Sequence, residues 1–141
     1  MAAIATMGGN PYCNTVPGDF PLPKCPSYDL ACVQLIHKNY TTLAQDVYDD
    51  ACVAWNGLNA DLGDCQSEAL GSYIECVTNC NGEVECYLAC RATLDSERAV
   101  CQETFDIDEA ALEASVAADI AALRAAVAEA IKLCCNEAPS K

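Results

Sequence analysis

Apolar residues recur every three or four positions along most of the chain, which is the spacing of one face of an α-helix. This pattern is interrupted at Gly57, at Asn81-Gly82 and near Asp106. The two glycine positions are typical of helix ends, and Asp106 with Glu109 has the spacing of a capping box that begins a helix. The sequence therefore predicts four helices, at about 28–56, 61–80, 83–104 and 107–135.

No segment of the sequence alternates apolar and polar residues as a strand would. Four amphipathic helices with short links predict an all-α fold, an up-down-up-down four-helix bundle over residues 28–138. Residues 1–27 hold five of the six prolines, and proline both fixes φ and removes a hydrogen-bond donor. We therefore predict that this segment is an extended Pro-rich N-terminal arm.

Six of the cysteines form a mirror around the turn that contains Glu83. In each nested pair, the two cysteines lie at equal distances before and after Glu83. At about 100° per residue, the three cysteines that precede the turn fall within roughly 60° of one helix face, and so do the three that follow it. Antiparallel helices in this register predict three disulfides, Cys80–Cys86, Cys76–Cys90 and Cys65–Cys101.

The other six cysteines are placed by the expected direction of the helices. The first helix begins at the end of the bundle where the fourth helix finishes, so Cys25 and Cys32 should lie near Cys134 and Cys135. The pairing among these four cysteines stays open. Cys52 is left for Cys13, and an extended arm is long enough to reach it along the first helix. Six disulfides at about 2–4 kcal/mol each predict a very durable protein.

Composition bounds the compartment and the partners. An even number of cysteines, twelve in 141 residues, indicates an oxidising compartment, outside the cell or on its surface. The net charge of −14 disfavours binding to nucleic acid or to an anionic membrane surface. No stretch of the sequence is apolar enough to span a membrane. The first nine residues lack the basic start and apolar run of a complete signal peptide, so a secreted chain is expected here in a processed or re-started form.

The two CX3C motifs between Cys76 and Cys90 resemble the helical-hairpin scaffolds of plant α-hairpinins and of the twin-CX3C small translocase chaperones. The resemblance covers this segment alone. It implies the shape of a helical hairpin and assigns no functional residue.

The sequence offers little chemistry beyond its cysteines. His37 is the single histidine and is expected to be a partly exposed helix residue, and no phosphate-binding glycine loop or nucleophile–base pair is present. We therefore predict that the protein is not an enzyme and holds no cofactor or metal. A Cu(I) store remains an alternative, because CX3C places two sulfurs on one helix face. Against it, Cys13 and Cys25 lie in the arm, and thiolate ligands need no mirror register.

Two functions fit a stapled helical protein without catalytic groups. The first is a secreted or surface structural subunit that self-assembles into a filament or layer, with the arm residues Ile4, Met7 and Tyr12 packing on a neighbouring copy. The second is a secreted carrier that binds an apolar ligand between its helices. We expect the first, with a homo-oligomer or polymer formed through the N-terminal arm.

Overall fold

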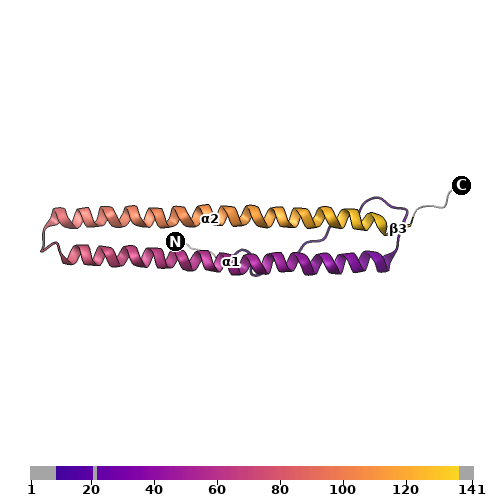
Figure 1. Ribbon diagram of the computed structural model, residues 1–141, viewed down its shortest axis with the longest axis horizontal. Coiled ribbons are helices and arrows are strands. Elements are labelled where there is room, and N and C mark those ends of the chain that lie inside the picture. Colours follow the sequence, from indigo (N-terminus) through magenta and orange to yellow (C-terminus); the bar gives the residue numbers. More distant parts are fainter. Residues whose placement is uncertain (1–8, 21, 137–141) are drawn as a thin grey trace. The chain divides into compact units, whose positions relative to one another are not determined.

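The computed structural model describes residues 9–20 and 22–136, and the protein is all-α in these ranges apart from two very short strands. Helix α1 spans Leu30–Thr78 and helix α2 spans Val84–Leu133 (Figure 1). Strand β2, Ser27–Tyr28, pairs antiparallel with strand β3, Cys135–Asn136.

The prediction of four helices was wrong, because neither of two expected breaks interrupts the helix. Gly57 lies inside α1, where a glycine costs only about 1 kcal/mol relative to alanine. Asp106 and Glu109 lie inside α2 and do not form a cap there. The Asp106 carboxylate instead accepts a hydrogen bond from Gln102 Nε2 at 2.9 Å. The Glu109 carboxylate accepts one from Trp55 Nε1 at 2.8 Å.

The break at Asn81-Gly82 is present, and it joins α1 to α2. Both residues have positive φ, 53° for Asn81 and 84° for Gly82. The Glu83 N–H donates to the Cys80 carbonyl at 3.1 Å, which closes a four-residue turn around them. Asparagine followed by glycine is the pair best suited to two consecutive left-handed positions.

The chain divides into two compact units. Unit 1 comprises residues 1–53 and 113–141, and unit 2 comprises residues 54–112. In unit 1 the core is formed where α1 packs against α2, with Tyr40 and Ala44 meeting Val127 and Ile131. Phe20, from the extended segment before α1, packs against this core and places its ring 5.3 Å from that of Tyr40.

Unit 2 is a helical hairpin with a core that consists largely of sulfur. Its buried apolar residues, within the described part of the chain, are two aliphatic residues and three half-cystines: Ala69, Leu94, Cys80, Cys90 and Cys101. Away from the turn, Trp55 adds an edge-to-face contact with Phe105, their ring centres 5.9 Å apart. Because so few aliphatic side chains are buried, the disulfides carry much of the cohesion of this unit.

Strands β2 and β3 were not predicted, because two residues are too few to show an alternating pattern. Their ladder continues with the Asp29 N–H, which donates to the Cys134 carbonyl at 2.9 Å. Asp29 also caps α1, since its carboxylate accepts the Cys32 N–H at 3.2 Å. The pairing therefore fixes the start of α1 against the end of α2.

We expect opposite effects from alanine at Gly57 and at Gly82. Gly57→Ala should stabilise the protein by about 0.5–1 kcal/mol, because the site is helical and a methyl group there meets no neighbour within 4 Å. Gly82→Ala should destabilise it by about 1–2 kcal/mol, because the turn requires positive φ. Thermal unfolding followed by circular dichroism measures both. A destabilising Gly57→Ala would contradict a continuous α1.

Candidate functional site

Three disulfides cross unit 2, two of them between α1 and α2 and the third between the turn that follows α1 and α2. They join Cys80 to Cys86, Cys76 to Cys90 and Cys65 to Cys101, with Cα–Cα distances of 5.5, 5.9 and 5.8 Å. These are the three pairs that the mirror in the sequence predicts. On each side of the turn, the two cysteines nearest to it are four residues apart. This spacing of about one helical turn places them on the same side of the hairpin, one above the other.

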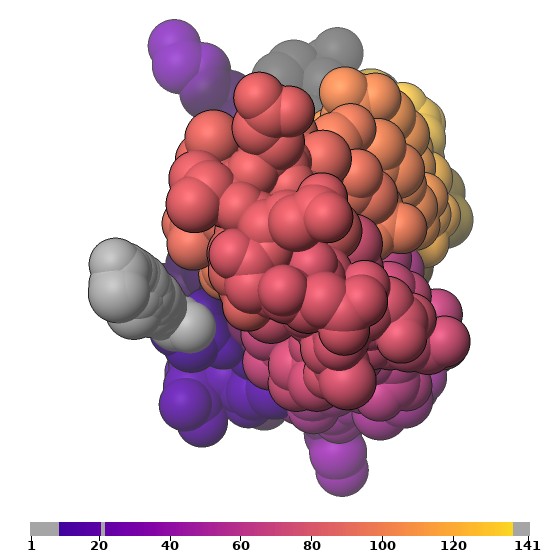
Figure 2. All heavy atoms as spheres, turned by 90° about the vertical axis from the view of Figure 1, so that its left-hand side faces the viewer, coloured from indigo at the N-terminus to yellow at the C-terminus, as the bar shows by residue number. Residues whose placement is uncertain are grey.

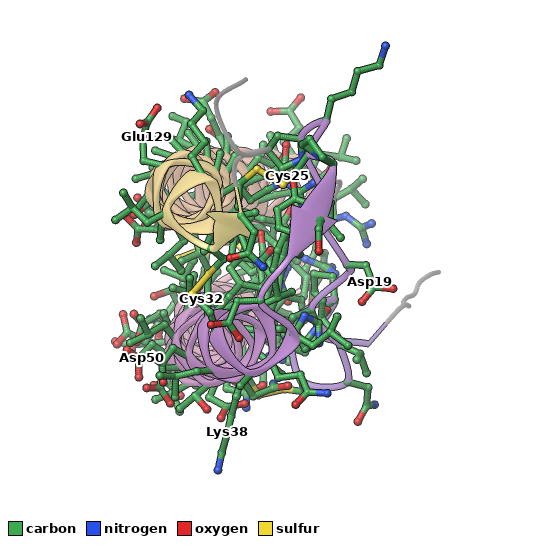
Figure 3. The ribbon with its side chains drawn as sticks, turned by 90° about the vertical axis from the view of Figure 1, so that its right-hand side faces the viewer. Asp19, Cys25, Cys32, Lys38, Asp50 and Glu129 are labelled. Carbon is green, nitrogen blue, oxygen red and sulfur yellow. A yellow bond between two sulfur atoms is a disulfide. The ribbon has the colours of Figure 1, made fainter. Side chains whose placement is uncertain are left out.

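The other three disulfides lie in unit 1. Cys13 is joined to Cys52, as expected, and the pairing that the sequence left open is Cys25–Cys135 and Cys32–Cys134 (Figure 3). Cys134 follows the last residue of α2, and Cys135 is already part of β3. The change from helix to strand therefore lets two adjacent cysteines reach different partners, one on α1 and one in the extended segment.

The described part of the arm is held by its own unit. Asn10 Nδ2 donates to the Cys52 carbonyl at 2.8 Å, beside the Cys13–Cys52 disulfide. Further along, Arg124 Nη1 donates to the Asp19 carbonyl at 3.2 Å. The Tyr28 hydroxyl donates to the Pro23 carbonyl. The extended segment is thus anchored at several points along its length.

The three residues predicted to form an assembly arm have different outcomes. Ile4 and Met7 lie outside the described residues. Tyr12 is buried in unit 1, and its N–H donates to Asn10 Oδ1 at 2.9 Å. Tyr12 therefore packs within its own chain, which leaves Ile4 and Met7 as the part of that prediction still to be tested.

Sequence reasoning missed the exposed apolar faces of the two helices. In unit 2, Leu70 and Ile74 lie one turn apart on α1, and Val84 and Leu88 lie one turn apart on α2. These four side chains, which we call the unit 2 apolar rows, are between 50 and 68% exposed. Figure 2 shows the surface of the molecule from the side of the Asn81-Gly82 turn. A bundle of four helices would have covered such side chains, and a hairpin of two does not.

Unit 1 has an apolar groove between α1 and α2. Leu43, Val47 and Leu123 line it, and this open groove has a volume of about 440 Å³. Three carboxylate side chains, those of Asp46, Asp50 and Asp119, also line it. The groove can accept an apolar group of modest size, and its carboxylates would disfavour an anionic one.

The cysteines are in the wrong redox state for soft-metal ligation. All twelve lie within the described residues, and each is in a disulfide. The sulfurs of Cys80, Cys86 and Cys90 do lie within 4.8 Å of one another. A Cu(I) store would use thiolates, so this arrangement disfavours the copper alternative.

Six intramolecular disulfides are consistent with an oxidising, extracellular environment. Neither helix, over the residues that the structure describes, combines the length and the apolar character needed to cross a membrane. Comparison with protein-family models, with curated proteins and with solved structures found no match to this chain.

Proposed function

We propose that the protein is a non-enzymatic, secreted or surface-exposed structural subunit that self-assembles into a filament or layer. The observation that carries this proposal is the unit 2 apolar rows. An aliphatic side chain moved from water into an interface contributes about 1.5–3 kcal/mol when it is fully buried. The two pairs, one on each helix of unit 2, are exposed apolar surface that association would cover.

The disulfides fit this role. An extracellular assembly has to persist without repair. The protein has a small core, and its six disulfides add to the stability of the folded state by restricting the unfolded chain. The net charge of −14 acts against non-specific association, so contacts between copies have to come from particular surfaces.

In this proposal the residues before Gly9 take part in the contact between copies. Ile4 and Met7 are apolar, and the arm is anchored to its own unit from Asn10 onward. A short apolar segment that precedes such an anchor can pack on a neighbouring copy. An interface between two different surfaces is heterologous and propagates into a filament or layer when it does not close into a ring.

Sedimentation velocity of the oxidised full chain over a wide concentration range tests the proposal. We expect association that increases with concentration. The paired substitution Leu70→Gln with Ile74→Gln should weaken it at least tenfold, because two aliphatic side chains are lost from the interface. The matched control is Ser72→Gln with Ser96→Gln, which places the same side chain at two exposed serines of unit 2. A wild-type chain that stays monomeric at high concentration would refute self-assembly.

A carrier of an apolar ligand is the second candidate, and the groove lined by Leu43, Val47 and Leu123 favours it. Native mass spectrometry of protein purified without detergent tests this function. A co-purified apolar molecule that is lost in Leu123→Gln would support a carrier. A protein of bare mass that also binds no apolar dye at this groove would count against it.

A further inference from the structure

The two disulfides nearest the turn are in direct contact with each other. Cys80 Sγ lies 3.6 Å from Cys90 Sγ, although the two atoms belong to different disulfides, Cys80–Cys86 and Cys76–Cys90. This contact arises because the two cysteines on each side of the turn are four residues apart, which is about one helical turn. Cys65 lies 11 residues before Cys76 along α1, a rise of roughly 16 Å, so the third disulfide is too far along the helix to join the contact.

The four sulfurs differ in access to solvent. Cys80 and Cys90, the pair in contact, are 3 and 1% exposed. Cys76 and Cys86, at the outer ends of the two disulfides, are partly exposed. A reagent in solution can therefore reach an outer sulfur, while the two inner sulfurs are protected from it and adjacent to each other.

We propose that these two disulfides form an exchange relay, in which a small thiol that opens Cys80–Cys86 at Cys86 produces a free thiol at Cys76. The co-reactant is a low-molecular-weight thiol such as glutathione. The relay needs no further oxidant or reductant, because each step exchanges one disulfide for another.

The thiolate of the small thiol attacks Cys86 Sγ, so a mixed disulfide forms there, the Cys80–Cys86 bond breaks and Cys80 leaves as a thiolate. The Cys80 thiolate then attacks Cys90 Sγ, so Cys80–Cys90 forms, Cys76–Cys90 breaks and Cys76 leaves as a thiolate. Cys76 takes up the proton that the small thiol lost. Burial disfavours a thiolate at Cys80, and partial exposure favours one at Cys76, so the second step proceeds outward.

The relay produces a free thiol near the turn, at Cys76, which is held in a disulfide in the oxidised protein. Opening the Cys80–Cys86 disulfide leaves unit 2 with a new cross-link, Cys80–Cys90, between the turn that follows α1 and helix α2. The hairpin stays closed while an accessible thiol appears on α1. That thiol could be alkylated, or could form a disulfide with another thiol-bearing molecule.

The substitution Cys86→Ser tests the exchange step directly, because it leaves Cys80 without its partner beside an intact Cys76–Cys90 disulfide. We expect alkylation of the folded, oxidised variant, followed by peptide mapping, to place the label on Cys76 and to find a Cys80–Cys90 peptide. The control is Cys101→Ser, which frees Cys65 away from the contact and should be labelled at Cys65. Label on Cys80 with Cys76–Cys90 intact would overturn the proposal.

If Cys86→Ser does not fold by circular dichroism, the wild-type protein decides the question. After treatment with glutathione under native conditions and alkylation, the relay predicts glutathione on Cys86 and the alkyl label on Cys76 in one molecule. An alkyl label on Cys80 overturns it, and so does a folded protein in which these two disulfides never open.

Discussion

Removing both disulfides that join the segment before β2 and the start of α1 to the residues that follow α2 is expected to lower the free energy of unfolding by about 6–7 kcal/mol. The change combines Cys25→Ser, Cys32→Ser, Cys134→Ser and Cys135→Ser. These bonds close the longest loops in the chain, with sequence separations of 110 and 102 residues. Without them, the long loop between the start of α1 and the residues after α2 is no longer closed in the unfolded chain, and only the Cys13–Cys52 loop and the three disulfides of unit 2 still restrict it.

Either bond removed alone should cost far less, about 2 kcal/mol or under, because the loop it closes is then only a few residues long. With Cys25–Cys135 intact, the unfolded chain still holds Cys32 close to Cys134 through the short segments between them. The two bonds are thus redundant, and their effects should be strongly non-additive.

Guanidinium unfolding followed by far-UV circular dichroism measures all three variants. The matched control is Cys80→Ser with Cys86→Ser, because that bond closes a loop with a separation of only 6 residues and should cost about 2 kcal/mol. Two single-bond variants whose losses add up to that of the double variant would contradict redundancy. In the double variant we also expect the melting temperature to fall by roughly 20 °C.

The three disulfides of unit 2 could be predicted from the sequence because a disulfide couples residue number to geometry, whereas the pairing among Cys25, Cys32, Cys134 and Cys135 could not. Two antiparallel helices advance by the same rise per residue, so residues at equal distances from the turn face each other. The nested pairs from Cys80–Cys86 to Cys65–Cys101 satisfy this condition, and the structure joins them. The Cys13–Cys52 disulfide could be predicted because these two cysteines were left without other partners, and because an extended segment is long enough to bring Cys13 to Cys52.

The mirror of cysteines around Glu83 extends beyond the hairpin, and the four-helix prediction did not take this into account. Cys32 and Cys134, which the structure joins, are also equidistant from Glu83. A break in only one of the two helices would shift the pairing of residues that lie at equal distances from Glu83. The continued mirror is therefore the signal that favours two uninterrupted helices. Gly57 was misleading because a glycine ends a helix where φ turns positive, and in the described chain Gly82 is the glycine with positive φ.

The candidate assembly surface could not be predicted, because exposure depends on how many helices pack together. Leu70, Ile74, Val84 and Leu88 follow the helical period whether or not another helix covers them. Once two helices replace four, the side chains that point away from the partner helix have nothing to pack against. The apolar rows are thus a consequence of the helix count, which the sequence pattern left undetermined.

The core of unit 1 provides the other large effect that we expect. Ile131 is completely buried among Tyr40, Ala44 and Val127, so Ile131→Ala removes buried methyl and methylene groups and leaves a cavity. Such changes cost about 2–5 kcal/mol, and the disulfides that bind α1 to the end of α2 limit how far the site can collapse to fill the gap.

Leu133→Ala is the matched control, because Leu133 lies two residues further along α2 and is 86% exposed. It should change the free energy of unfolding by less than about 0.5 kcal/mol. Chemical unfolding of both variants, with all six disulfides verified by mass, makes the comparison. If Ile131→Ala costs no more than Leu133→Ala, the packing of Tyr40 and Val127 around Ile131 does not stabilise unit 1, and its disulfides alone hold α1 against α2.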